Sequence, residues 1–356
     1  MSFVPGLVLC RRFHDEVVGP AVRRSFPGLR YAAGRLDSGS ELLGLDTPRS
    51  TDHDWGPRVQ IFVGPGDLGL PARIETAVAA ALPPSFLGYP TAYAGGPTTG
   101  LGVLSAHGDR HGVGVVELGE WLRAALGFDP RRGVRTADWL AIPTQRLAEV
   151  TGGAVFHDDL DELAGIRAAL AWYPDDVWRH VLAAQWTRIG QEEHFVGRCA
   201  EVGDELGSRL VAGRIARDLA RLHLLLGRRY PPYGKWLGSE LARLPGSEPV
   251  TGALTALVTA DSWPDRQVAL CRALEAAAVR TNETGLAEPV EPTVRPFHHR
   301  PFLVLHADRF AAALRAAITD PALRQRPPVG AVDQFVDSTD VLAYTERFRA
   351  AARSLR

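Results

Sequence analysis

The stretch SGSELLGLDTPRSTDHD, residues 38–54, decides how this chain is interpreted, because it combines a glycine–serine turn with two spaced aspartates. Asp52 and Asp54 stand two residues apart, and on a β-strand such side chains point to the same face. Two neighbouring carboxylates repel each other, and Mg²⁺, which prefers oxygen ligands together with substrate phosphates, relieves that repulsion. The spacing therefore predicts a metal site on a strand over residues 51–63, with Asp52 and Asp54 as the ligands.

The Gly39-Ser40 pair upstream of the aspartates predicts a tight turn. Its backbone N–H groups and the serine hydroxyl are suited to hold the oxygens of a triphosphate. The alternative is a solvated turn, because aspartate favours turns as well. Strands expected over residues 31–36 and 51–63 flank this segment and favour the interpretation as a nucleotide site, and a third strand is expected over 113–118.

The pattern resembles the signature of the polymerase-β-type nucleotidyltransferases. The matching positions here are Gly39, Ser40, Gly44, Asp52 and Asp54, with Thr51 where the family has serine. The resemblance implies transfer of a nucleoside monophosphate from ATP or another nucleoside triphosphate, with Mg²⁺ bound at the phosphates. It also implies an α+β fold in which a nucleotidyltransferase-like mixed sheet with helices is followed by a helical C-terminal domain.

Four longer segments resemble the family called domain of unknown function 4037, which has no assigned substrate. They are STDHDWGPR, LAAQWTRIGQEEHFVGRCAEVGDELGS, YPPYGKWLG and VDQFVDSTDVL. The layout is also similar, in architecture, to the aminoglycoside adenylyltransferases. In those enzymes a helical C-terminal domain closes over ATP and the acceptor.

The nucleotidyltransferase resemblance calls for a third carboxylate on a neighbouring strand, as a metal ligand or as the base for an acceptor hydroxyl. Glu117 in GVGVVEL is the first choice, and Glu120 and Asp109 are alternatives. Gly114 stands at an equally suitable position on the opposite face of that strand. If Gly114 is the true third position, the protein has lost this carboxylate and is a degenerate enzyme.

The second half of the chain offers further candidates. Lys235 in YPPYGKWLG is the only lysine, placed at an expected helix start, and it either meets nucleotide phosphates or lies on the surface. Arg214, Arg217 and Arg221 share a helix face, for which an ion-paired surface is favoured over a phosphate-binding stripe. A polar cluster near the C-terminus is a weaker candidate, consisting of Asp333, Gln334 and Asp337.

Composition limits the remaining possibilities. The 356 residues carry a net charge of −1, which argues against large nucleic acids as partners, and no apolar run is long enough to span a membrane. Three widely separated cysteines favour a cytoplasmic location. The expected domains are a nucleotidyltransferase-like domain over residues 1–143, a helical domain over 144–290 and a C-terminal α/β extension over 291–356.

These observations predict a cytoplasmic, Mg²⁺-dependent nucleotidyltransferase. Its partners would be a nucleoside triphosphate, with ATP the first candidate, and an unidentified small-molecule or protein acceptor. One alternative is a degenerate nucleotide-binding or regulatory protein. Another is a toxin–antitoxin-type nucleotidyltransferase that acts on tRNA or on a protein.

Overall fold

The computed structural model describes residues 3–66, 68–95 and 101–354, and the chain forms two compact units. The first unit contains Met1–Gly133 and Arg146–Ala171, and the second contains Val134–Gln145 and Trp172–Arg356. The segment expected as a separate extension, residues 291–356, thus lies within the second unit. Within the described residues, no helix has the length and apolar character needed to cross a membrane.

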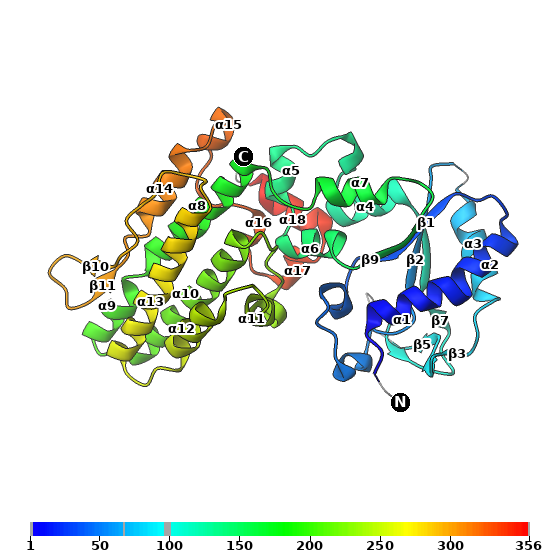
Figure 1. Ribbon diagram of the computed structural model, residues 1–356, viewed down its shortest axis with the longest axis horizontal. Coiled ribbons are helices and arrows are strands. Elements are labelled where there is room, and N and C mark those ends of the chain that lie inside the picture. Colours follow the sequence, from blue (N-terminus) through cyan, green and yellow to red (C-terminus); the bar gives the residue numbers. More distant parts are fainter. Residues whose placement is uncertain (1–2, 67, 96–100, 355–356) are drawn as a thin grey trace. The chain divides into compact units, whose positions relative to one another are not determined.

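A four-stranded mixed sheet forms the centre of the first unit (Figure 1). The strand order is β8–β2–β1–β9, with β1 at Tyr31–Arg35, β2 at Val59–Val63, β8 at Val113–Glu117 and β9 at Ala154–Asp158. Strand β1 is antiparallel to both of its neighbours, whereas β2 and β8 run parallel. The expected mixed sheet followed by a helical region is confirmed, although β9 was not anticipated.

Helices cover both faces of this sheet. Alternate strand residues such as Tyr31 and Ile61 share one buried cluster with Phe13 of α1 and Ile74 of α3. On the other face, Phe62 packs against Trp121 of α4, with ring centroids 4.9 Å apart. The helices of this unit are α1 (Gly6–Phe13), a π-helical turn (His14–Val18), α2 (Gly19–Ser25), α3 (Leu70–Ala79), α4 (Leu118–Leu126), a 3₁₀ turn (Pro130–Arg132), α7 (Leu163–Ala169) and most of α6 (Thr144–Thr151).

The connection from β1 to β2 departs from the expected strand over residues 51–63. It contains two 3₁₀ helices, η2 (Ser40–Leu43) and η3 (Pro48–Asp52), and the strand begins only at Val59. Pro48 in the first turn of η3 and the capping box between Thr47 and Ser50 favour a helical turn. The strand prediction is therefore wrong for residues 51–58.

The connection from β2 to β8 contains α3 followed by five short strands. These strands are β3 (Ser85–Phe86), β4 (Tyr89–Pro90), β5 (Ala92–Ala94), β6 (Val103–Leu104) and β7 (Arg110–His111). Residues 96–100 lie outside the described part of the chain. The pairs β3–β4, β5–β6 and β5–β7 are all antiparallel.

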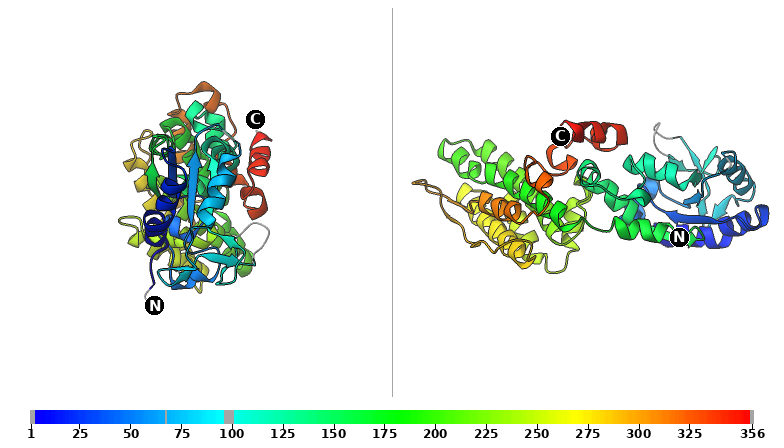
Figure 2. Two further views of the ribbon diagram at one scale, coloured as in Figure 1. Left: turned by 90° about the vertical axis from the view of Figure 1, so that its right-hand side faces the viewer. Right: turned by 90° about the horizontal axis from the view of Figure 1, so that it is seen from above.

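The second unit is mainly helical. Helix α8 packs against α10 and α14, and α13 packs against α10 and α12; the right-hand view of Figure 2 shows these green, yellow and orange helices side by side. The longer helices are α8 (Asp175–Glu192), α9 (Phe195–Glu201), α10 (Glu205–Leu226), α11 (Gly234–Ala242), α12 (Glu248–Thr259), α13 (Trp263–Glu283), α14 (Asp308–Ala316) and α18 (Thr345–Arg353). The shorter elements are α5 (Thr136–Ala141), α15 (Pro321–Arg324), α16 (Val332–Phe335), α17 (Thr339–Leu342) and the antiparallel pair β10 (Arg295–Pro296) and β11 (Leu303–Val304).

Candidate functional site

The glycine–serine turn directly follows β1 and begins the 3₁₀ helix η2. Gly39 has φ 143°, a conformation that favours glycine. A Cβ atom at this position would lie 2.4 Å from the Oε2 atom of Glu41. Gly44 ends η2 in the left-handed conformation with φ 63°. The turn therefore needs both glycines for its backbone shape, and Gly39 also makes room for the Glu41 carboxylate.

A buried charge cluster lies beneath this turn. The guanidinium of Arg35, from the last position of β1, donates to the Glu41 carboxylate at 2.8 Å and to the carbonyl oxygens of Leu36 and Ser38. Arg58 lies on the other side, with Nη1 3.9 Å from Glu41 Oε1. Burial, followed by repulsion from Arg35, lowers the pKa of Arg58. Two guanidinium groups thus surround one carboxylate, which leaves the cluster with an excess of positive charge.

The two aspartates of the Asp-x-Asp pair lie before β2 and not on it. Asp52 is the last residue of η3; its carboxylate is largely exposed and lies 2.9 Å from Nδ1 of His53. Asp54 has φ 49°, and its carboxylate accepts a hydrogen bond from the Gly102 N–H at 3.0 Å. Its carbonyl oxygen accepts a hydrogen bond from Arg58 at 2.6 Å, which links Asp54 to the buried cluster. The expectation that a shared strand aligns both carboxylates is therefore wrong.

The candidate third carboxylate has a structural partner of its own. Glu117 ends β8 and caps α4, accepting hydrogen bonds from the N–H groups of Gly119 at 2.7 Å and Glu120 at 2.9 Å. Gly114 pairs with Gln60 of β2, and a Cβ atom added at Gly114 would meet nothing within 4 Å. Among residues 3–66, 68–95 and 101–354, no three His, Cys, Asp or Glu side chains are grouped so that they could hold a metal ion.

A pocket of about 460 Å³ opens beside the first residues of β2 and β8. Its charged lining residues are Arg35, Arg58, Glu75, Asp109 and Arg110, joined by His111 and, on the strands, by Val59, Gln60, Val113 and Gly114. Because Arg35 is fully buried against Glu41, the guanidinium groups that an anion in this pocket would meet are those of Arg58 and Arg110. Arg35, Glu41 and Arg58 were not singled out from the sequence, because nothing local indicates that they pair across the β1–β2 connection.

Lys235 belongs to the second unit, at the start of α11. Its ammonium lies 4.8 Å from the ring centroid of Trp236, a cation–π contact. Its expected contact with nucleotide phosphates remains a prediction.

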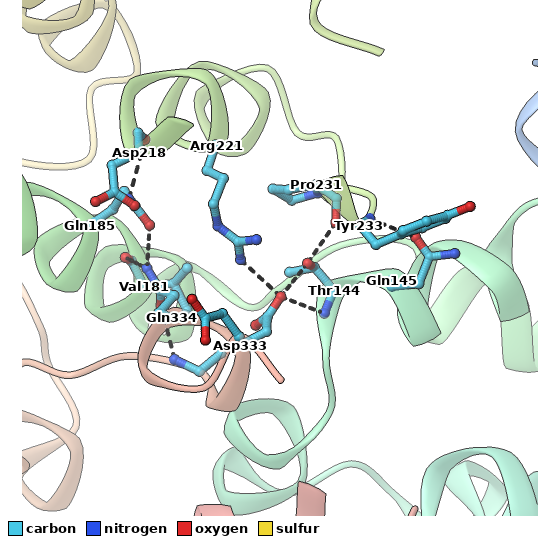
Figure 3. Close-up of polar contacts among 12 residues, drawn as sticks. Thr144, Gln145, Val181, Gln185, Asp218, Arg221, Pro231, Tyr233, Asp333 and Gln334 are labelled. Carbon is cyan, nitrogen blue, oxygen red and sulfur yellow. Dashed lines mark hydrogen bonds and ion pairs between the residues drawn. The ribbon is translucent and has the colours of Figure 1, made fainter. Parts of the chain in front are cut away.

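The second unit also contains a buried polar network that joins distant parts of the sequence (Figure 3). Arg221 of α10 donates to Asp333 Oδ2 of α16 at 2.9 Å, and the N–H of Thr144 donates to the same oxygen at 3.1 Å. Gln334 donates to Gln185 of α8 at 3.0 Å. The expected surface stripe of arginines is therefore wrong for Arg221, which is buried and paired. The sequence marked both groups of residues but did not indicate their pairing, because 112 positions separate Arg221 from Asp333.

Comparison with known proteins supports the resemblance over part of the chain. Residues 139–237 match the family model described as "Domain of unknown function (DUF4037)". A crystal structure of a nucleotidyltransferase-like protein from Exiguobacterium sibiricum is similar over 88% of this chain and 91% of that chain, with 15% sequence identity and a TM-score of 0.34. No curated protein matches the chain. The resemblance to the family of unknown function is thus confirmed for the segment that runs from α5 into α11.

Proposed function

We propose that the protein is a nucleotidyltransferase that binds a nucleoside triphosphate, with ATP the first candidate, in its N-terminal unit. It would transfer the nucleoside monophosphate to a small-molecule or protein acceptor. The observation that carries the proposal is the placement of the Gly39-Ser40 and Asp52-x-Asp54 segment. This segment joins two adjacent antiparallel strands and rests on a buried cluster with excess positive charge.

The pocket of the first unit supports the same function. A triphosphate brings several negative charges, which Arg58 and Arg110 of the pocket lining would partly neutralise. Gly39 and Ser40 would hold phosphate oxygens at the turn. Glu117 would be the base only if it leaves its capping role, so Asp109, which lines the pocket, is the alternative base.

Mg²⁺ fits the carboxylate chemistry of Asp52 and Asp54, which would be its protein ligands. The ion would supply neutralisation of the phosphate charge. Mg²⁺ is commonly bound through one or two carboxylates plus substrate phosphates. Because the described residues contain no group of three metal-binding side chains, we expect the ion to bind together with the nucleotide and not before it.

Isothermal titration with a non-hydrolysable ATP analogue tests this proposal. We expect binding that requires Mg²⁺ and that Asp52→Asn/Asp54→Asn abolishes. Asp161→Asn is the matched control, because Asp161 is an exposed aspartate of the same unit and also has positive φ. If no analogue of ATP, GTP, CTP or UTP binds at millimolar concentration, the proposal is wrong.

One observation favours a degenerate relative that binds nucleotide without turnover. Gly114 lines the pocket and has open space where a side chain would be, while Glu117 is engaged as a cap. Incubation with ATP labelled at the α-phosphate, in the presence of cell extract, distinguishes the two functions. A labelled product together with released pyrophosphate indicates the enzyme, and nucleotide binding without either indicates the degenerate protein.

A further inference from the structure

A second pocket, of about 410 Å³, lies within the helical unit between α10 and the α16 segment. Its charged lining residues are Arg188, Arg214, Arg217, Asp218, Arg221, Asp333 and Asp337. Four guanidinium groups face three carboxylates of the lining, and the remaining arginine, Arg214, pairs with Glu192. The volume is that of a small-molecule site.

The inner wall of this pocket is held by buried ion pairs. Arg221 pairs with Asp333 at 2.9 Å, and Arg188 pairs with Asp218 at 3.2 Å. The side chains of Asp333 and Asp218 are each only 5% exposed. The carboxylates of both pairs are therefore well shielded from water.

One oxygen in this wall has no donor. Asp333 Oδ2 accepts hydrogen bonds from Arg221 and from the N–H and hydroxyl of Thr144, but Asp333 Oδ1 is buried and has no hydrogen-bond partner among the described residues. A buried carboxylate oxygen without a donor is unfavourable. Because Asp333 lines the pocket, a small shift of its side chain would bring Oδ1 within reach of a hydroxyl group of a ligand, which could supply that donor.

The rim of the pocket presents guanidinium groups that are only loosely held. Arg217 lies 3.7 Å from Asp337, and Arg214 lies 3.0 Å from Glu192; both arginines are about half exposed. An exposed pair such as Arg217–Asp337 contributes little to stability, so an incoming anion can replace it at small cost. Arg214 and Arg217 are three residues apart on α10 and therefore share one face of the helix.

We propose that this pocket binds a small phosphate monoester that also carries a hydroxyl group. The hydroxyl donates to Asp333 Oδ1 at the inner wall, and the phosphate oxygens accept hydrogen bonds from Arg214 and Arg217 at the rim. A phosphate suits this rim better than a carboxylate, because it offers three acceptor oxygens and up to two negative charges to the two planar guanidinium groups. The proposal concerns binding only and does not depend on the nucleotide site of the first unit.

Isothermal titration with ribose 5-phosphate, ribose and inorganic phosphate tests the proposal. We expect ribose 5-phosphate to bind at least tenfold more tightly than either fragment, because it engages both ends of the pocket. Arg217→Gln should weaken its binding about tenfold or more, as expected for a hydrogen bond to a charged group. Arg209→Gln is the matched control. Arg209 also lies on α10 and pairs with one carboxylate, and its side chain is 41% exposed against 42% for Arg217.

The variants also separate the two sites. Asp52→Asn/Asp54→Asn should leave the binding of ribose 5-phosphate unchanged, whereas Asp333→Asn should reduce its affinity to that of inorganic phosphate. The proposal is overturned if ribose 5-phosphate binds no more tightly than phosphate, or if Arg217→Gln and Arg209→Gln have equal effects. It is also overturned if no probe binds at millimolar concentration. Asp333→Asn removes a buried charge and could fail to fold. Arg217 is exposed, so the Arg217→Gln variant is expected to fold, and it tests the proposal on its own.

Discussion

Arg35 and Glu41 form an ion pair that is almost completely shielded from water. The guanidinium and the carboxylate lie 2.8 Å apart, and their side chains are 0% and 2% exposed. Arg35 is the last residue of β1 and Glu41 lies in the first turn of η2, so the pair holds the end of β1 next to the start of η2. The conformation of the glycine–serine turn therefore depends on a buried electrostatic contact.

Neutralising the acid of this pair should strongly destabilise the first unit. Glu41→Gln leaves the buried charge of Arg35 without its counter-ion and is expected to lower the free energy of unfolding by about 3–5 kcal/mol. Urea unfolding measures the effect. Glu16→Gln is the control, because the Arg12–Glu16 pair is as short, at 2.7 Å, but half exposed. That change should cost at most about 1 kcal/mol, and equal effects of the two variants would contradict the prediction.

Gly39→Ala should destabilise the protein through a clash with the same carboxylate. The added Cβ atom would lie 2.4 Å from Glu41 Oε2, in addition to the strain of alanine at φ 143°. We expect the free energy of unfolding to fall by more than the roughly 1 kcal/mol that left-handed backbone strain alone costs. Gly28→Ala is the control, because Gly28 has φ 79° but open space around it. Thermal unfolding of both variants should show the larger decrease for Gly39→Ala.

Asp176 should stabilise the second unit at neutral pH. Burial would raise its pKa, but hydrogen bonds from Thr319, Asp320 and Arg179 outweigh that effect and lower the pKa to about 2. Since the folded-state pKa lies below the usual value, this stabilisation is present at neutral pH and is lost as the pH falls from about 4 to 2.

Asp176→Asn should therefore lower the free energy of unfolding by about 1–2 kcal/mol at pH 7 and by much less near pH 2. Denaturant unfolding at several pH values checks this. Asp175→Asn is the matched control, because this exposed neighbour shares the first turn of α8 and the same helix dipole. A loss that stays the same down to pH 2 would show that ionisation is not the cause.

Two buried histidines should make the second unit sensitive to mild acid. Burial lowers the pKa values of His180 and His223 to about 4. The unfolded chain then binds more protons between about pH 4 and 6.5, so stability falls as the pH decreases through this window. From pH 7.5 to 5.5 the two residues together should cost about 2–3 kcal/mol.

The histidine effect is best measured as a difference between variants. Burial also raises the pKa of Glu193 to about 7, which adds a dependence of opposite sign in the same range. Comparison of the wild type with His180→Gln/His223→Gln isolates the histidines, because Glu193 is common to both proteins. Urea unfolding followed by circular dichroism should show a weaker loss in acid for the double variant. If the free energy of unfolding depended on pH in the same way in the wild type and the double variant, the assignment of the acid sensitivity to these histidines would be contradicted.

The fold could be predicted from local patterns where the period of apolar residues was clear. The alternation in Val59, Ile61 and Val63 predicted β2, and the region after residue 144 was correctly expected to be rich in helices. Prediction failed where local turn chemistry overrides alternation: Pro48 starts a 3₁₀ helix that extends to Asp52 and so includes the first two residues of the expected strand. Strand β9 was missed because its five residues are recognised only by pairing with β1.

The sequence by itself determined the tight turn at Gly39-Ser40, the chemical types at the Asp52-x-Asp54 motif and the helix-rich character of the chain after residue 144. Spacing and composition are local properties, so these features do not depend on distant residues. Only the tertiary structure decided that Arg35 and Arg58 enclose Glu41, that Glu117 caps a helix and that Arg221 meets Asp333. These relationships depend on which charged groups lose water together when the chain folds, and that is settled by contacts between residues far apart in the sequence.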